Sequence, residues 1–358
     1  MKYKLQKDRD SNMELLRIVA MFLVLVVHAD FFSLGIPTYE ESIQDVLPTI
    51  SRFFFQSLSI CCVDVFVLIS GWFGIRPNLK SFLSFIFQCL FFLCGIYFVC
   101  LISGYTSFSW SGVLECFVMT KHNWFIKSYI FLYILAPILN SFVKYTSEKE
   151  LRHTLIAFYA FQTIFGWGTS SVSFFVNGYS TTSFIGLYLL ARYIKLYNPC
   201  VARIKKTQNL LLFVAIVVVL TLVAYLLCRF NVSKLIPSLY TKIYSYINPL
   251  VILSALFLLL YFSKLNIHNT GINKIAASCF AVFLLHQNAN LIPWYKNCVL
   301  FCYNSFCGLR CLLLISAYLV SVFFFAIIVD RIRLLCWNLL VLLFKAKQEI
   351  YPKDNMPC

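Results

Sequence analysis

Long uninterrupted runs of apolar residues recur along the chain, separated by short stretches that hold most of the charged side chains. The runs are about 20 residues long, and they lack the alternation of apolar and polar positions that marks a strand. Only helices or closed barrels satisfy the backbone inside a bilayer, so these runs predict transmembrane helices. We predict ten spans, at residues 12–32, 46–70, 80–103, 124–143, 151–168, 181–198, 208–228, 245–263, 274–293 and 311–330. The expected fold class is therefore all-α, a polytopic helical bundle in a membrane.

The composition excludes an ordinary soluble protein. Of the 358 residues, 61% are hydrophobic and only 12% are charged. A soluble domain of this size could not bury so much apolar surface, whereas membrane spans present it to lipid.

The cationic residues predict which side of the membrane each end occupies. An even number of spans places both termini on one side, and cytoplasmic segments carry an excess of Lys and Arg. Such residues precede the first span and follow the second, fourth, sixth and tenth, among them Lys2, Arg9, Arg76, Lys144, Arg203 and Arg333. Acidic residues fill the first loop between spans, at Asp30, Glu40, Glu41 and Asp45. Both termini are thus expected in the cytoplasm, and the net charge of +16 reflects topology and contact with lipid headgroups rather than nucleic-acid binding.

Three segments follow from these patterns. Residues 1–11 form a cytoplasmic N-terminal segment, and the apolar run after them is too long and too polar inside to be a cleaved signal peptide. Residues 12–330 form the ten-span domain. The text after residue 330 is basic at its start, so we expect the tenth helix to end there and residues 331–358 to form a cytoplasmic or interfacial amphipathic tail.

Ionisable residues share one face of the first predicted span. His28 follows Arg17 by eleven residues, which returns to within about 20° of the same helix face, with a rise of about 16 Å. Glu14 falls on the same stripe and is placed to neutralise Arg17. Ionisable groups inside a span are costly and mark functional paths, so the stripe predicts a polar site inside the bundle.

Five segments carry a resemblance to a known family. They are RDSNMELLRIVAMFLVLVVH at 9–28, VDVFVLISGWFG at 63–74, NWFIKSYIFLYILAPILN at 123–140, GLYLLARYIKLY at 186–197 and FAVFLLHQN at 280–288. In this order they resemble the integral-membrane acyltransferase family 3, with the Arg17-to-His28 spacing as the most specific mark. The resemblance implies a bacterial inner-membrane enzyme that moves an acyl group, most often acetyl from acetyl-CoA, onto hydroxyls of surface carbohydrates.

The resemblance and the chemistry together suggest catalytic residues. Acyl transfer needs a base for the hydroxyl proton and a cationic or donor-rich site for the oxyanion. His28 is the expected base. Arg17 supports the donor or the oxyanion, or else only pairs with Glu14. Asp64 either orients His28 or forms a salt bridge with Arg52 or Lys127, and His286 lines the same cavity or makes an interhelical hydrogen bond.

Other residues are expected to bind substrates. Trp124 and Lys127 open the fourth span at the outer side, where they contact a sugar or serve as an interfacial anchor. Arg76, Lys80 and Arg192 form a cationic rim at the cytoplasmic mouth that suits the phosphates of CoA, although topology alone also predicts cations there. The family often has two arginines three residues apart in this place, and here no second arginine follows Arg76 at that spacing; Lys80 is the next cation.

The fifteen cysteines add little to this picture. Most lie singly within spans, where thiols pack as small apolar groups. Cys298, Cys302, Cys307 and Cys311 fall in the last predicted outer loop, where disulfides are open to them but a zinc-site spacing is absent. We expect no metal and no bound cofactor, with acetyl-CoA or another acyl-CoA as a substrate.

The sequence therefore predicts an O-acyltransferase acting on a surface polysaccharide or its polyprenyl-linked precursor. Direct transfer is favoured because no nucleophile elbow is visible. A covalent acyl-His28 intermediate stays open as an alternative, as does a separate extracellular protein that completes the transfer. The alternative is a proton-coupled transporter or flippase of a lipid-linked sugar. Transporters usually carry repeats and broken helices, and neither is evident here. A non-catalytic scaffold is disfavoured by the charged stripe.

Overall fold

The computed structural model describes residues 10–232 and 238–350, and within these ranges every regular element is helical. The longer helices that build the bundle are α1 (Ser11–Ala29), α4 (Val46–Ser59), α5 (Cys62–Phe73), α6 (Leu79–Ile102), α8 (Trp124–Tyr145), α9 (Glu148–Phe161), α10 (Thr181–Tyr197), α12 (Lys206–Arg229), α14 (Pro249–Ser263), α17 (Ile292–Ser305) and α18 (Gly308–Ile350). Shorter helices connect them, namely α2 (Phe31–Leu34), α3 (Tyr39–Gln44), α7 (Trp110–Cys116), α11 (Cys200–Arg203), α13 (Leu239–Ile243), α15 (Thr270–Ala276) and α16 (Phe280–His286). The all-α prediction is confirmed.

Polar side chains mark where several helices begin. Asn78 caps α6 by accepting from the Lys80 amide at 2.9 Å, and Ser147 forms a capping box with Glu150 at the start of α9. Asn248 caps α14, whose first residue is Pro249. Each cap satisfies amide groups that the first turn leaves without a helical partner.

Six helical stretches in the described part of the chain are long and apolar enough to cross a membrane. They are Ser11–Leu34, Val46–Phe73, Leu79–Ile102, Trp110–Tyr145, Lys206–Arg229 and Gly308–Leu343. Pro249–Ser263 and Thr270–His286 are apolar but shorter, and α9 and α10 match the remaining two predicted spans. The chain is thus a polytopic helical membrane protein, and the number ten stays a prediction.

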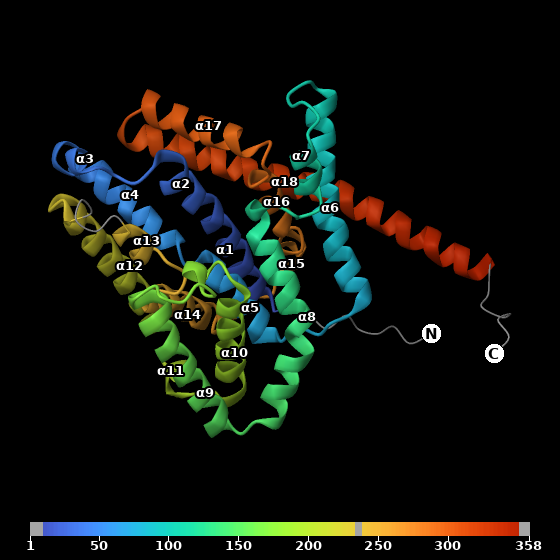
Figure 1. Ribbon diagram of the computed structural model, residues 1–358, viewed down its shortest axis with the longest axis horizontal. Helices are drawn as coiled ribbons and strands as arrows, with labels where there is room; N and C mark the ends of the chain where they lie inside the picture. The colour runs from blue at the N-terminus through green and yellow to red at the C-terminus, as the bar shows by residue number, and fades with distance from the viewer. Residues whose placement is uncertain (1–9, 233–237, 351–358) are drawn as a thin grey trace.

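Helix α1 lies in the middle of the bundle and touches α4, α5, α14, α15 and α16 (Figure 1). Beside it, α5 and α10 approach closely at Gly71. A Cβ at that position would lie 2.5 Å from the Tyr188 carbonyl oxygen, so glycine is what allows the two backbones to meet. This packing places the C-terminal end of α5 against α10.

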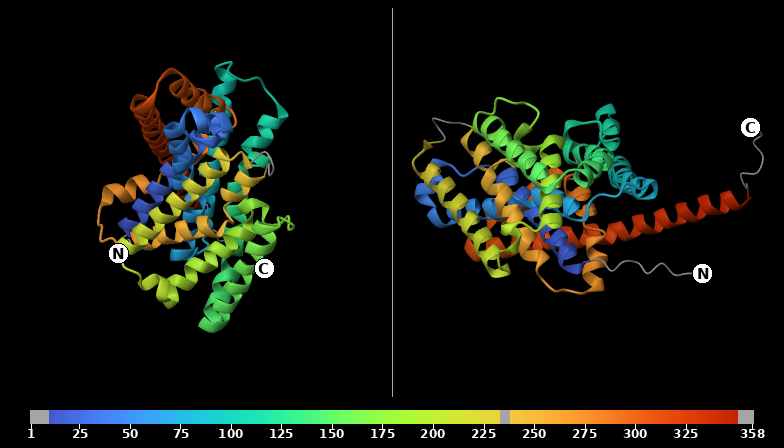
Figure 2. Two further views of the ribbon diagram at one scale, coloured as in Figure 1. Left: turned by 90° about the vertical axis from the view of Figure 1, so that its left-hand side faces the viewer. Right: turned by 90° about the horizontal axis from the view of Figure 1, so that it is seen from below.

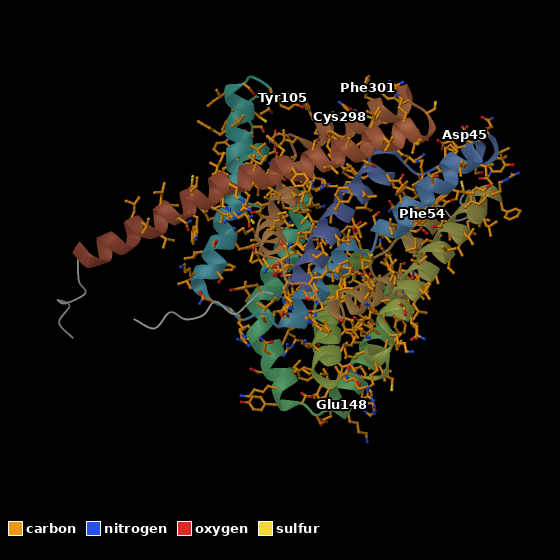
Figure 3. The ribbon with its side chains drawn as sticks, turned by 180° about the vertical axis from the view of Figure 1, so that it is seen from behind. Asp45, Phe54, Tyr105, Glu148, Cys298 and Phe301 are labelled. Carbon is orange, nitrogen blue, oxygen red and sulfur yellow. The ribbon has the colours of Figure 1, made fainter. Side chains whose placement is uncertain are left out.

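The two ends of the bundle carry loops predicted to lie on opposite sides of the membrane. Asp45 and Tyr105 lie at one end, and Glu148 lies at the other (Figure 3). These loops thus lie at opposite ends of the bundle, and which end faces the cytoplasm stays a prediction.

One expectation about the C-terminal third is wrong. The tenth helix does not end at residue 330, because α18 continues unbroken to Ile350 and its C-terminal half projects from the bundle (Figure 2). Arg333 is accommodated by pairing, since it donates to Asp330 at 2.7 and 2.9 Å, and Gln88 of α6 donates to Asp330 at 2.9 Å. The segment predicted as the last outer loop contains the helix α17.

Candidate active site

A cavity of about 520 Å³ opens between α1, α5, α8 and the segments before α14 and after α16. Aromatic side chains form much of its wall, and the polar residues that line it include His28, Gln56, Lys121, His122 and Gln287. Cavities of this size and character hold small organic ligands.

His28 and His286 meet at this cavity, although they are 258 positions apart. His28 Nδ1 lies 3.0 Å from His286 Nε2, and His286 Nδ1 lies 2.6 Å from the Val282 carbonyl oxygen one turn earlier in α16. Of the two roles predicted for His286, the structure therefore shows the interhelical hydrogen bond, and His286 is not among the residues that line the cavity. His286 is 1% exposed, whereas His28 lines the cavity.

The hydrogen bonds of the pair fix where its protons lie. The Val282 carbonyl only accepts, so His286 Nδ1 carries the proton and neutral His286 presents a lone pair at Nε2. His28 Nδ1 then donates to that lone pair, and neutral His28 has its own acceptor lone pair at Nε2. The pair thus holds His28 in a tautomer suited to accept a proton at Nε2.

Tyr295 of α17 contacts the His286 ring and the backbone of α1 near His28. Its hydroxyl donates to the Leu25 carbonyl of α1 at 2.6 Å, and its ring lies 5.5 Å from the His286 ring. The tyrosine is 3% exposed. It therefore links α1 to α17 one turn before His28.

Arg17 and Glu14 lie away from the cavity. Arg17 pairs with Glu14 within α1, and the side chains are 29% and 7% exposed. The predicted pairing is confirmed, but neither residue lines the cavity that holds His28. The face of α1 that these residues share therefore carries two separate polar sites, the Arg17–Glu14 pair and His28.

Asp64 meets neither of its predicted partners. Arg52 instead pairs with Asp30 at 3.3 Å and with Glu41 at 3.5 Å, and Lys127 donates to the Thr120 carbonyl at 2.7 Å. The predicted salt bridge of Asp64 is thus wrong. The carboxylate is 1% exposed, its Oδ2 has no hydrogen-bond partner among the described residues, and it does not line the cavity.

Trp124 lies on the cavity wall, as expected of a residue that contacts substrate. Its ring centroid is 4.5 Å from that of Tyr179, in an edge-on arrangement, and 6.2 Å from that of Tyr246. Lys127 is exposed and lies outside the cavity. Of this predicted pair, the structure brings only the tryptophan to the histidines.

The predicted cytoplasmic rim surrounds the link between α5 and α6. Arg76 and Lys80 are exposed there. Arg192 of α10 approaches Gly74, where a Cβ would lie 2.9 Å from its Nη1, and Arg192 Nε is buried without a hydrogen-bond partner in the described chain. Gly74 has φ of +72°, so glycine suits both this turn and the approach of the guanidinium. Three cations thus gather at one end of α5.

Sequence reasoning missed most of the cavity wall. His122, Tyr179, Tyr244 and Tyr246 all line it, and none was predicted. A signal existed only for His122, which stands two residues before Trp124 at the edge of a quoted family segment. The tyrosines come from distant loops that no periodicity connects.

The cysteine cluster and metal binding play no part in this geometry. Cys298, Cys302, Cys307 and Cys311 are free thiols in the structure. Within residues 10–232 and 238–350, no group of three or more His, Cys, Asp or Glu side chains is arranged to hold a metal ion.

Comparison with known proteins assigns the chain to a family. Residues 10–331 match the acyltransferase domain of acyltransferase family 3, which covers all but the two ends of the chain. No curated protein and no solved structure matches it. The match includes α1, the cavity and both histidines, and it favours acyl transfer over the transport alternative. The chain belongs to acyltransferase family 3 and is a multi-pass membrane acyltransferase.

Proposed function

We propose that this enzyme transfers an acetyl group from cytoplasmic acetyl-CoA to a hydroxyl of a surface polysaccharide or its polyprenyl-linked precursor, in a bacterial inner membrane. The observation that carries the proposal is the His28–His286 pair, with its 3.0 Å contact and its fixed tautomer, at the wall of an aromatic cavity. Acyl transfer to a hydroxyl needs a neutral base at that place.

The step uses His28 as the base. His28 Nε2 takes the proton of the acceptor hydroxyl as its oxygen attacks the thioester carbonyl carbon, and a tetrahedral oxyanion forms. The C–S bond then breaks, the acyl group stays on the acceptor oxygen, and the CoA thiolate leaves and receives the proton. His286 Nε2 accepts from His28 Nδ1 throughout, which stabilises the imidazolium that His28 becomes.

The acceptor is proposed to enter the cavity from the outer side. Trp124, Tyr179 and Tyr246 supply flat apolar faces, against which the carbon–hydrogen face of a sugar ring packs. Direct transfer fits a cavity that holds the base, and a separate extracellular protein is needed only if the acceptor never reaches it.

The donor is proposed to bind at the opposite end. Arg76, Lys80 and Arg192 offer cations for the phosphates of CoA, and Arg192 Nε lacks a protein partner in the described chain. Arg17 is partly exposed beside Glu14 and is proposed to bind the donor from α1. We assign no step to Asp64, and Lys127 is proposed to hold the Thr120 carbonyl rather than substrate.

The test is transfer of labelled acetyl from acetyl-CoA to surface polysaccharide in membranes that contain the protein. Wild type should label the polysaccharide, and His28→Ala at equal expression should not. His153→Ala is the matched control, because His153 is an exposed histidine of α9 outside the cavity. Equal labelling by wild type and His28→Ala would remove His28 from the step, and no labelling by wild type would contradict the proposed function.

A further inference from the structure

His122 lines the same cavity as His28, yet the transfer step above does not use it. It lies in the 3-10 turn Lys121–Asn123, directly before α8, and it is half-buried. The chain has five histidines, and three of them, His28, His122 and His286, gather at this one place. We therefore expect a functional role for His122 as well.

The proton of His122 is fixed in the same way as that of His286. His122 Nε2 is hydrogen-bonded to the carbonyl oxygen of Gln287, the residue after His286. Because that oxygen only accepts, Nε2 carries the proton, and the neutral ring has its lone pair at Nδ1. Nδ1 makes no hydrogen bond within the described chain. The cavity therefore contains a second nitrogen that can accept a hydrogen bond.

The turn that carries His122 is held in place by a buried carboxylate. Glu115 is 7% exposed and accepts from Asn123 Nδ2 at 2.7 Å and from the Thr120 hydroxyl. Lys127 donates to the Thr120 carbonyl from the first turn of α8. These bonds, together with the contact to Gln287, fix the ring before any substrate binds, which lowers the entropy lost on binding.

Two fixed acceptor nitrogens suit a substrate with two hydroxyl groups. His28 of α1 and His122 of the turn before α8 both line this cavity. His28 Nε2 takes the proton of the hydroxyl that reacts. A neighbouring hydroxyl on the same molecule is the natural donor to His122 Nδ1, and the aromatic wall fits a ring that carries both.

We propose that His122 is a specificity-determining residue that selects acceptors with two neighbouring hydroxyls on a six-membered ring. Its Nδ1 accepts a hydrogen bond from one hydroxyl and thereby holds the other against His28. The inference rests on the proposed function and specifies its acceptor class, a ring vicinal diol. A mono-alcohol makes one of these two bonds and a vicinal diol makes both.

The test compares two probe alcohols, cis-1,2-cyclohexanediol and cyclohexanol, as acceptors of labelled acetyl from acetyl-CoA. The readout is the ratio of their kcat/KM values. Two hydroxyls that react independently give the diol a ratio of about two, and one neutral hydrogen bond adds a factor of up to about ten, so wild type should favour the diol by up to about twentyfold. His122→Ala should bring the ratio back to about two.

Two variants separate binding from structure. Asn at position 122 places an amide oxygen near the position of Nδ1, so His122→Asn should keep a preference for the diol. Gln reaches the position of Nε2 instead, so His122→Gln should keep the bond to the Gln287 carbonyl and lose the preference. His153→Ala serves as the control and should show the wild-type ratio.

Each result decides the inference. A ratio that is the same in wild type and His122→Ala, including a case in which both rates fall together, would give His122 a structural role and overturn the proposal. If the polysaccharide is labelled in a His28-dependent way while neither alcohol reacts, the function stands and the diol class is wrong. If neither polysaccharide nor alcohol is labelled by wild type, the proposed function itself fails.

Discussion

The two ends of α1 hold their ionisable residues in different ways. Near its start, Arg17 pairs with Glu14, three positions away on the same helix. Near its end, His28 pairs with His286, which is 258 positions away on α16. The first pair neutralises a charge within one helix and leaves Arg17 partly exposed. The second fixes a proton beside a cavity, and the proposed chemistry uses this end, whose partner comes from elsewhere in the chain.

The largest expected effect is on the rate of acetyl transfer, and it concerns His28 near the C-terminal end of α1. His28→Gln removes the base, and general bases contribute about 10²- to 10⁴-fold, so kcat for acetyl transfer should fall by that factor. KM for acetyl-CoA should change little, because His28 lies at the acceptor cavity. Steady-state kinetics in detergent or vesicles measure both constants. An unchanged kcat would show that the His28 end has no special role.

The second effect concerns the partner of the base. His286→Ala leaves His28 Nδ1 without its acceptor, so kcat should fall by about 10- to 100-fold, as is found when an orienting partner is lost. His286→Gln returns an amide oxygen to the region of Nε2 and should recover part of the rate. If His286→Ala and His286→Gln have the same kcat, His286 serves only to pack α16 against α1.

The third effect belongs to the other end. If Arg17 binds the donor, Arg17→Gln should raise KM for acetyl-CoA by about tenfold, the equivalent of one charge-assisted hydrogen bond, with a smaller change in kcat. The matched comparison is His28→Gln, which should show the opposite division between the two constants. A large fall in kcat for Arg17→Gln would mean that the two ends of α1 act together in the chemical step.

The smallest effect tests how the His28 end is held. Tyr295→Phe removes the 2.6 Å bond from the hydroxyl to the Leu25 carbonyl and keeps the ring beside His286. We expect a loss of about 1 kcal/mol in the free energy of unfolding, measured by denaturation in detergent, and a modest fall in kcat. A fall in kcat as large as that of His286→Ala would show that Tyr295 also positions the histidine pair for the chemical step.

The fold was largely predictable because membrane helices depend on local features of the sequence. Apolar length places the helices, and caps such as Asn78 and Asn248 place their starts. The prediction failed after residue 330, where charge was taken to end the helix. Asp330 pairs with Arg333 there and accepts a hydrogen bond from Gln88, which lies 242 positions away, beyond what local patterns reveal.

The residues of the site also fall into two groups, those that the local sequence predicts and those that only the packing of distant segments brings together. His28, His286 and Trp124 could be predicted because the family segments contain them. His122, Tyr179 and Tyr246 could not, since they join the cavity only when α8, α10 and the segment before α14 pack together. The partner of Asp64 was wrong for a similar reason, because Arg52 satisfies Asp30 and Glu41 instead.

Helix α18 has a consequence for how the enzyme sits in a bilayer. Its candidate span, Gly308–Leu343, has 36 residues and is thus about 54 Å long, whereas the hydrocarbon core is about 30 Å thick. Even at a tilt of about 40°, the steep end of the usual range, only about 26 residues fit inside that core. The stretch also contains Asp330, Arg331 and Arg333, so its C-terminal part suits the headgroup region and the water beyond it. A helix of this length that crosses the bilayer therefore extends past its surface as a rigid arm.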